Sequence, residues 1–168
     1  MMFRVRNLVF VAMAGAFLSG CITVGDIRSA QGTSTTLIML RHAERPITGT
    51  ELTDKGRARA AALPAALKGT RIDVIYSPDL SRNLDTVAPL AKERGLKVKV
   101  LKIGWTAGVA SRIIPPNPGK TVLWVGNHDN LTEIYEDIGA EGKPPLDYGD
   151  LFILQIPDKG PVHVTRSR

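Results

Sequence analysis

The chain has 168 residues, of which 43% are hydrophobic and 23% are charged. This length suits one domain with a genuine core and is short for two, and the composition excludes wholesale disorder. The formal net charge of +6 at pH 7 suits an anionic substrate or an anionic lipid surface, but it is too small by itself to indicate nucleic-acid binding.

Residues 1–20 differ from the rest of the chain and predict a lipoprotein signal peptide. Arginines precede an apolar run over residues 8–18 that is too short to span a bilayer. The sequence Leu18-Ser19-Gly20-Cys21 resembles the lipobox of bacterial lipoproteins, in which the cysteine is lipidated and becomes the mature N-terminus. An uncleaved signal anchor and a plain secretory peptide are the alternatives. Cys21 is the only cysteine, which excludes an internal disulfide and a thiolate metal site.

The signal peptide predicts an exported protein anchored in the cell envelope. Cleavage before Cys21 would remove Arg4, Arg6 and no acid, and would lower the formal charge from +6 to +4. Residues 21–35 are rich in Gly, Ser and Thr and predict a polar tether, so we expect the folded domain to span residues 36–168. The expected location is the periplasmic side of the envelope, and Ile22 after the cysteine favours the outer membrane if the organism is Gram-negative.

Predicted strands and helices alternate through the remaining chain. Apolar runs predict buried strands at residues 36–40, 72–76 and 121–125, and alternating lysines predict an edge strand at 96–101. Capping and spacing predict helices over 53–68, 79–94 and 131–138, the first of them kinked or split by Pro64. Residues 104–119 predict at most a short helix, and 151–156 with 162–165 predict a hairpin. The expected fold is a three-layer α/β/α sandwich with a mostly parallel central sheet and helices on both faces.

Three of the predicted strands end in segments that contain arginine or histidine. Arg41 and His42 follow the first strand, and Arg82 lies in the first turn of the helix after the second. His128 follows the strand at residues 121–125. Because the carboxyl ends of parallel strands share one edge of a sheet, we expect these four side chains to converge.

Such a set of side chains is suited to phosphoryl transfer. Two guanidinium groups match the oxygens of a phosphoryl group, and a protonated imidazole would add a further donor. The other imidazole, that of His42, could attack phosphorus if a backbone carbonyl held its second nitrogen in the protonated form. The arginines would neutralise the charge without a metal or cofactor, and three histidines without paired spacing make a metal site improbable.

These residues resemble the signature of the histidine phosphatase superfamily, also called the phosphoglycerate mutase-like superfamily. The matching blocks, in order, are Arg41-His42-Ala43-Glu44, Leu52-Thr53-x-x-Gly56, Tyr76-Ser77-x-Asp79-Leu80-x-Arg82-x-x-x-Thr86, and the late His128. The resemblance covers about residues 36–140. It implies that His42 is the nucleophile that becomes phosphorylated, and that Arg41, Arg82 and His128 bind the phosphoryl group.

The chain departs from the family pattern in ways that leave the proton donor open. Ala43 replaces the usual glycine, and Asn127 stands before His128 where small members have glycine or serine. No acid occurs between residues 93 and 129, where the family usually has one. Asp129 resembles the proton donor of the acid phosphatase branch and is the first candidate for this role, although it could equally cap the following helix. Glu44 is the second candidate.

The expected function is that of a metal-independent phosphohydrolase that cleaves phosphomonoesters through a phosphohistidine on His42. Arg45, Glu44 and Asn127 are candidate substrate contacts, although Arg45 could merely lie at the mouth of the pocket. Only a short loop separates Pro46 from the next block, so an open site is expected, suited to a small phosphorylated molecule or an exposed phosphate on something larger. The alternatives are a phosphohistidine phosphatase that acts on protein, and a non-catalytic envelope lipoprotein that binds an anion. Nothing in the sequence indicates an oligomeric state.

Overall fold

The computed structural model describes residues 25, 27–102, 104 and 106–167. The sheet and helices follow one another along the chain as β1 (Ser34–Arg41), α1 (Asp54–Ala66), β2 (Val74–Pro78), α2 (Ser81–Arg94), β3 (Val98–Leu101), α3 (Val109–Ile113), β4 (Thr121–Gly126), α4 (His128–Asp137), β5 (Leu151–Pro157) and β6 (His163–Ser167). Each predicted strand and helix is present, although several boundaries differ. The predicted signal peptide and the lipidation site Cys21 lie outside the described residues.

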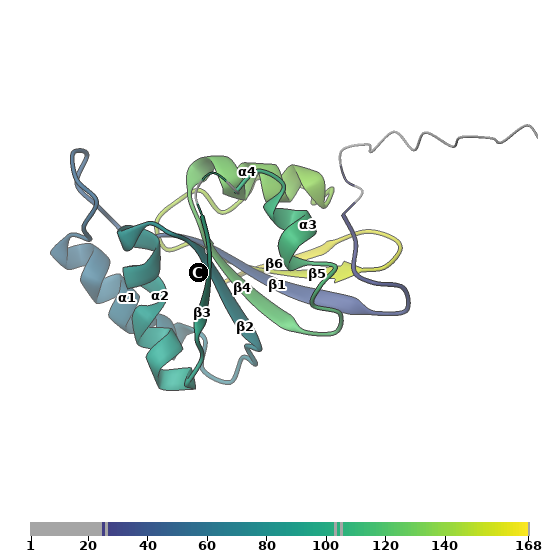
Figure 1. Ribbon diagram of the computed structural model, residues 1–168, viewed down its shortest axis with the longest axis horizontal. Helices are drawn as coiled ribbons and strands as arrows, with labels where there is room; N and C mark the ends of the chain where they lie inside the picture. The colour runs from purple at the N-terminus through teal and green to yellow at the C-terminus, as the bar shows by residue number, and fades with distance from the viewer. Residues whose placement is uncertain (1–24, 26, 103, 105, 168) are drawn as a thin grey trace, which may run out of the picture.

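One six-stranded sheet, in the order β3-β2-β4-β1-β5-β6, forms the centre of the molecule (Figure 1). The first four strands in this order are mutually parallel, while β5 and β6 are antiparallel additions at one side. The central strands β1 and β4 pair in register from Thr36 with Thr121 to Arg41 with Gly126. The carboxyl ends of β1, β2 and β4 therefore lie together at one edge, as the sequence predicted.

Alternate residues of the strands build two separate cores, one on each face of the sheet. Leu37 and Met39 of β1 pack in the core that contains residues of α3 and α4. Ile38 and Leu40 point to the opposite face and pack with residues of α1 and α2. Because both faces of β1 are buried, its sequence is continuously apolar rather than alternating. This arrangement confirms the predicted α/β/α sandwich.

Helix α1 begins where the sequence predicted but is not broken by its proline. The Thr53 hydroxyl caps the helix by accepting a hydrogen bond from Gly56 N at 3.1 Å. The helix continues to Ala66, so Pro64 does not split it, which was one of the two outcomes the sequence predicted. Pro64 lies in the last turn, so its missing N–H group removes only the hydrogen bond to the carbonyl four residues earlier and leaves the preceding turns intact.

Helix α4 begins three residues earlier than predicted. His128 and Asp129 form its first turn instead of belonging to the preceding loop, and Asn127 is its N-cap residue. The side chain of Asn130 accepts a hydrogen bond from Asn127 N at 2.9 Å. This local bond satisfies the backbone at the end of β4, so the strand passes into the helix almost directly.

The folded domain also begins earlier than the predicted boundary at residue 36. Strand β1 starts at Ser34, and Ile27 N donates a hydrogen bond to Asp137 O at 3.0 Å at the end of α4. Ser29 and Thr35 are buried, and their hydroxyl groups lie 2.8 Å apart. The described part of the predicted tether therefore packs against the domain, because Ile27 N bonds to the end of α4 and Ser29 N donates a hydrogen bond to Pro157 O of β5 at 3.4 Å. Within the described part of the chain, no helix is both long and apolar enough to cross a membrane.

Candidate active site

His42 lies immediately after β1, at the carboxyl edge of the sheet. Its backbone N–H donates a hydrogen bond to Gly126 O at the end of β4, at 3.0 Å, so the two strand ends fix its position. The residue is only 3% exposed. Nδ1 lies 2.8 Å from the carbonyl oxygen of Ala43 and can donate its proton there. The predicted backbone acceptor is therefore present, and it favours the tautomer whose Nε2 is an unprotonated nucleophile.

The surroundings of His42 keep its imidazole neutral. Burial lowers the pKa of His42 from 6.5 to about 4, against the opposing effect of the hydrogen bond to Ala43 O. The positive charges of Arg82, Arg41 and Arg45 also lower this pKa. A neutral imidazole among three guanidinium groups can attack an anionic phosphoryl group, which a protonated one could not do.

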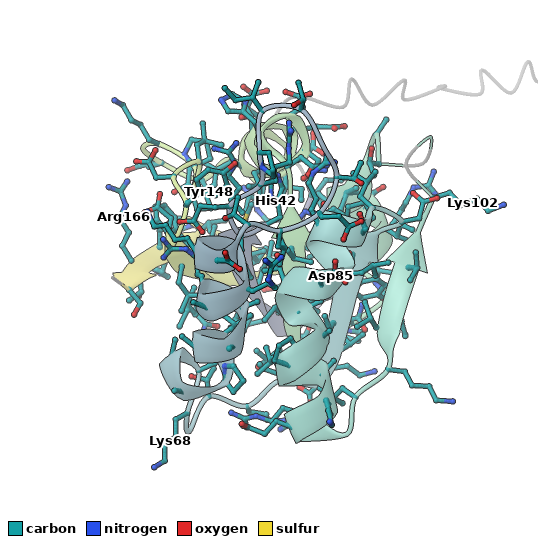
Figure 2. The ribbon with its side chains drawn as sticks, turned by 90° about the vertical axis from the view of Figure 1, so that its left-hand side faces the viewer. His42, Lys68, Asp85, Lys102, Tyr148 and Arg166 are labelled. Carbon is teal, nitrogen blue, oxygen red and sulfur yellow. The ribbon has the colours of Figure 1, made fainter. Side chains whose placement is uncertain are left out.

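Arg41 is held between the sheet edge and the loop that follows α4. Its Nη1 donates a hydrogen bond to Leu146 O at 2.8 Å, and its Nη2 donates one to the hydroxyl of Tyr148 at 3.4 Å. The guanidinium carbon lies 4.2 Å from the centre of the Tyr148 ring, in a cation–π contact. The imidazole of His42 lies 5.8 Å from the same ring, centre to centre. Figure 2 shows His42 and Tyr148 close together, well away from Lys68 beyond the other end of α1.

Arg82 approaches the same place from the first turn of α2. Its Nη2 donates a long hydrogen bond, 3.5 Å, to the Asn127 side chain. Burial lowers the pKa of the Arg82 guanidinium, the charges of Arg45 and Arg41 also lower it, and Tyr148 acts in the opposite direction. The Nε atoms of Arg41 and Arg82 are buried donors without a hydrogen-bond partner among the described residues. Unpartnered cationic donors beside a neutral imidazole are suited to an anionic ligand.

Arg45 and Asn127, two candidate substrate contacts, also have internal partners. Nη1 of Arg45 donates hydrogen bonds to Pro46 O at 2.8 Å and Ile47 O at 3.0 Å, which folds the loop around its own guanidinium. Asn127 caps α4 and accepts the bond from Arg82. Both residues therefore shape the site, and Arg45 adds positive charge near His42.

The second and third sequence blocks provide contacts that hold the segment after His42. The Thr86 hydroxyl accepts a hydrogen bond from Ala43 N at 2.9 Å and donates one to Arg82 O at 2.6 Å. Thr53 N donates a hydrogen bond to Glu44 O at 2.9 Å. A Cβ at Gly56 would lie 2.2 Å from that carbonyl oxygen, so only glycine allows α1 to approach this closely.

Glu44 is not suited to the role of proton donor that the sequence allowed for it. Its carboxylate accepts hydrogen bonds from Arg59 Nε at 2.8 Å and Arg59 Nη2 at 2.5 Å, and Lys55 Nζ lies 3.5 Å away. The bond from Arg59 is the main reason that the pKa of Glu44 is lowered from 4.5 to about 2. A carboxylate that stays ionised and is bound bidentately has no proton to give.

The structure does not bring Asp129 to His42 either. The Asp129 side chain is fully exposed, and its ionic partner is the adjacent His128, with 3.6 Å between Nδ1 and Oδ1. His128 is at the expected edge, two residues beyond Gly126, but its side chain is 62% exposed. Among the described residues, no hydrogen bond joins either side chain to Arg41, His42 or Arg82. The structure therefore brings Arg41, His42 and Arg82 together, and the convergence of His128 with them stays a prediction.

Two residues of the site were missed by the sequence reasoning. Tyr148 lies in an irregular loop with no recognisable pattern, and only the fold of the loop brings its ring to Arg41 and His42. Arg59 lies three residues after Gly56, on the side of α1 that faces Glu44, and helical spacing from Gly56 could have indicated it. No group of three or more His, Cys, Asp or Glu residues that could hold a metal ion occurs in the described ranges.

Comparison with known proteins agrees with this geometry. The model of the histidine phosphatase superfamily (branch 1) matches residues 37–103, which include most of β1, the segment that contains His42, and α2. A comparison with curated protein sequences finds no match.

Solved structures with the same fold include phosphatases and a phosphoglycerate mutase from Plasmodium falciparum. The protein histidine phosphatase SixA, solved with tungstate, superposes with a TM-score of 0.58 at 14% identity, covering 77% of this chain and 94% of that one. A putative α-ribazole-5′-P phosphatase from Escherichia coli superposes with a TM-score of 0.55 at 16% identity, covering 79% of this chain and 94% of that one. A mycobacterial glucosyl-3-phosphoglycerate phosphatase superposes with a TM-score of 0.54 at 16% identity, covering 79% of this chain and 98% of that one.

The chain is similar to histidine-type phosphatases in two respects. Its fold is shared with these solved structures. The segment that matches the model of the histidine phosphatase superfamily contains Arg41, His42 and Arg82.

Proposed function

We propose that this protein is a metal-independent phosphohydrolase that cleaves phosphomonoesters through a phosphohistidine on His42. The observation that supports this most directly is the state of that imidazole. It is buried and neutral, Nδ1 bonds to Ala43 O, and the guanidinium groups of Arg41 and Arg82 adjoin it. These features are what a nucleophilic imidazole needs, namely a free electron pair on Nε2 and cationic donors for the phosphoryl oxygens.

In the proposed reaction, Nε2 of His42 attacks phosphorus and the bond from phosphorus to the ester oxygen breaks. The guanidinium groups of Arg41 and Arg82 hold the three equatorial oxygens as charge spreads over them. Water then attacks the phosphohistidine and releases phosphate. Positioning and charge neutralisation by the two arginines supply the stabilisation that phosphoryl transfer requires.

The test is phosphate release from a panel of phosphomonoesters by the full chain in mild detergent, with a chelator present. His42→Asn should abolish turnover. His163→Asn, which alters an exposed histidine of β6, should leave it unchanged and serves as the matched control. Failure of the wild-type chain to release phosphate from any ester, while it still binds phosphate in an Arg82-dependent way, would contradict the enzyme and leave an anion-binding protein.

A second candidate substrate is a phosphohistidine on another protein. The loop after Arg45 is exposed beside the site, and Ile47 at its tip is 97% exposed, so an apolar contact is available to a protein surface. The solved structure of SixA, a protein histidine phosphatase, shares the fold. Dephosphorylation of a phosphohistidine domain, without activity on small esters, would favour this candidate, and Ile47→Asp should then reduce kcat/KM for the protein substrate alone.

We propose in addition that the domain is held in the cell envelope by a lipid on Cys21, following the signal-like residues 1–20. The support is the sequence pattern and the packing of the described residues from Ile27 onward, which leaves only a short connection to Cys21. Fractionation of cells that express the full chain tests it. Cys21→Ser should move the protein from the membrane fraction to the soluble fraction, and an unchanged distribution would contradict lipid anchoring.

A further inference from the structure

The site as described lacks a donor for the proton that a departing alkoxide needs. Asp129 points into solvent, and Glu44 is ionised and bound by Arg59. His42 is the nucleophile in the proposed reaction, so it does not supply this proton. We propose that the hydroxyl group of Tyr148 is the general acid that protonates the leaving group, a role that presupposes the phosphohydrolase function proposed above.

The position of Tyr148 fits this role. The centre of its ring lies 5.8 Å from that of His42 and 4.2 Å from the guanidinium carbon of Arg41. Arg41 Nη2 approaches the hydroxyl oxygen at 3.4 Å, so this oxygen accepts a bond and keeps its own hydrogen available. Within the described part of the chain, that hydrogen has no acceptor. The residue is half-buried, so a substrate can reach it.

Tyr148 is held in place by the turn that contains it. Leu146 O accepts the 2.8 Å hydrogen bond from Arg41 Nη1, which ties the turn to the end of β1. Asp150 N donates to Asp147 O at 3.2 Å, and Asp150 Oδ2 accepts a hydrogen bond from Asp147 N at 3.2 Å. Two reciprocal bonds on either side of Tyr148 keep the ring against Arg41. Because the ring is already held in position, the site reorganises little when the proton is transferred.

The proposed step balances as follows. Nε2 of His42 forms a bond to phosphorus, the bond from phosphorus to the ester oxygen breaks, and that oxygen takes the proton of the Tyr148 hydroxyl. The phenolate that remains is stabilised by the adjacent guanidinium of Arg41. In the second half, water attacks the phosphohistidine and gives a proton back to the phenolate. Phosphate leaves, and both residues return to their starting states.

Tyrosine is one of the side chains that act as general acids, and such proton transfer typically contributes about 10²–10⁴-fold to the rate. This contribution depends on the leaving group. An alkyl phosphate releases a strongly basic alkoxide that needs the proton, whereas p-nitrophenyl phosphate releases a stable phenolate that does not. A residue that only positions Arg41 would affect both substrates alike.

The experiment compares the wild-type chain with Tyr148→Phe on glycerol phosphate and on p-nitrophenyl phosphate. Phenylalanine keeps the ring and its contact with Arg41 and removes only the hydroxyl. We expect kcat for glycerol phosphate to fall by about 10²-fold or more, and kcat for p-nitrophenyl phosphate to change by less than about threefold. The matched control is Tyr135→Phe, which removes a hydroxyl bonded to Glu141 O away from the site and should affect both esters equally and slightly.

Equal losses of kcat on both esters in Tyr148→Phe would overturn the acid role and leave Tyr148 as a positioning residue for Arg41. Unchanged kcat on both would exclude it from the reaction. If the wild-type chain cleaves neither ester, the proposed function itself fails and the role of Tyr148 falls with it, so the two failures are distinguishable. A thermal melt of each variant shows whether a loss of rate is a loss of fold.

Discussion

The bidentate pair of Arg59 and Glu44 makes a stability prediction whose size follows from the structure. The lowered pKa of Glu44, about 2 instead of 4.5, means that the folded state prefers the ionised carboxylate. A difference of about 2.5 pKa units corresponds to about 3 kcal/mol of folding free energy at pH 7. The side chain of Glu44 is only 11% exposed, so solvent screens little of this interaction.

Arg59→Met should remove most of that stabilisation while it keeps the length of the side chain. We expect the free energy of unfolding to fall by about 2–3 kcal/mol at pH 7, because a buried carboxylate is left with weaker partners. Lys55→Met is the matched control. Lys55 contacts the same carboxylate at 3.5 Å, but its side chain is 76% exposed, so the loss should stay below about 1 kcal/mol.

The pH dependence of these losses provides the sharper test. Because the folded pKa of Glu44 is depressed, its contribution is complete above about pH 4.5, declines as the pH falls, and disappears below about pH 2. The cost of Arg59→Met should therefore fall to about half at pH 3, measured by urea denaturation at both pH values. Equal losses for the two variants, or a loss for Arg59→Met that does not change with pH, would refute the reasoning.

Three further predictions concern His42 and the contacts that hold the segment after it. In a pH–rate profile of the wild-type chain, kcat/KM should rise with pH through about 4 rather than 6.5, because only the neutral imidazole of His42 attacks; a limb near 6.5 that is also present in kcat, where the ionisation of the free ester does not enter, would contradict this. Thr86→Val should cost about 1–3 kcal/mol in denaturant melts and lower kcat, because Ala43 N would lose its buried acceptor; full activity would show that the bond is dispensable. Gly56→Ala should destabilise the chain by about 2 kcal/mol or more in the same melts, since its Cβ would meet Glu44 O at 2.2 Å; a neutral result would mean that α1 can shift.

The fold was predictable because its signals are local and repeated. Buried parallel strands such as β1 and β4 are continuous apolar runs, and Gly95, in a left-handed conformation, follows α2 at the residue where the predicted helix over 79–94 ends. The errors occurred where side chains bond across the chain. The Asn130 side chain bonds to Asn127 N, so α4 begins directly after β4. The hydroxyl of Ser29 bonds to that of Thr35, which connects the segment before β1 to this strand. Such bonds have no periodicity that a sequence can show.

The site was predictable as far as it depends on strand ends. Arg41, His42 and Arg82 each follow or lie near the carboxyl end of a parallel strand, so topology alone brings them together. The proton donor was not predictable, because its candidates were taken from the acids next to the recognised motif residues. Asp129 faces solvent, and Tyr148 comes from a loop whose path depends on contacts with Arg41 that only the folded chain contains.

The charge distribution of the site is suited to a proton donor that is not a carboxylate. Three guanidinium groups lower the pKa of His42, and a nearby ionised carboxylate would neutralise them and compete with phosphate for their donors. The one buried acid in the catalytic loop, Glu44, is bound by Arg59 on the α1 side instead. A neutral phenol can lie against Arg41 without cancelling its charge, and it can still supply a proton when negative charge develops on the leaving oxygen. The guanidinium groups therefore remain available to the phosphoryl oxygens of the substrate. The proton for the leaving group comes from the Tyr148 hydroxyl.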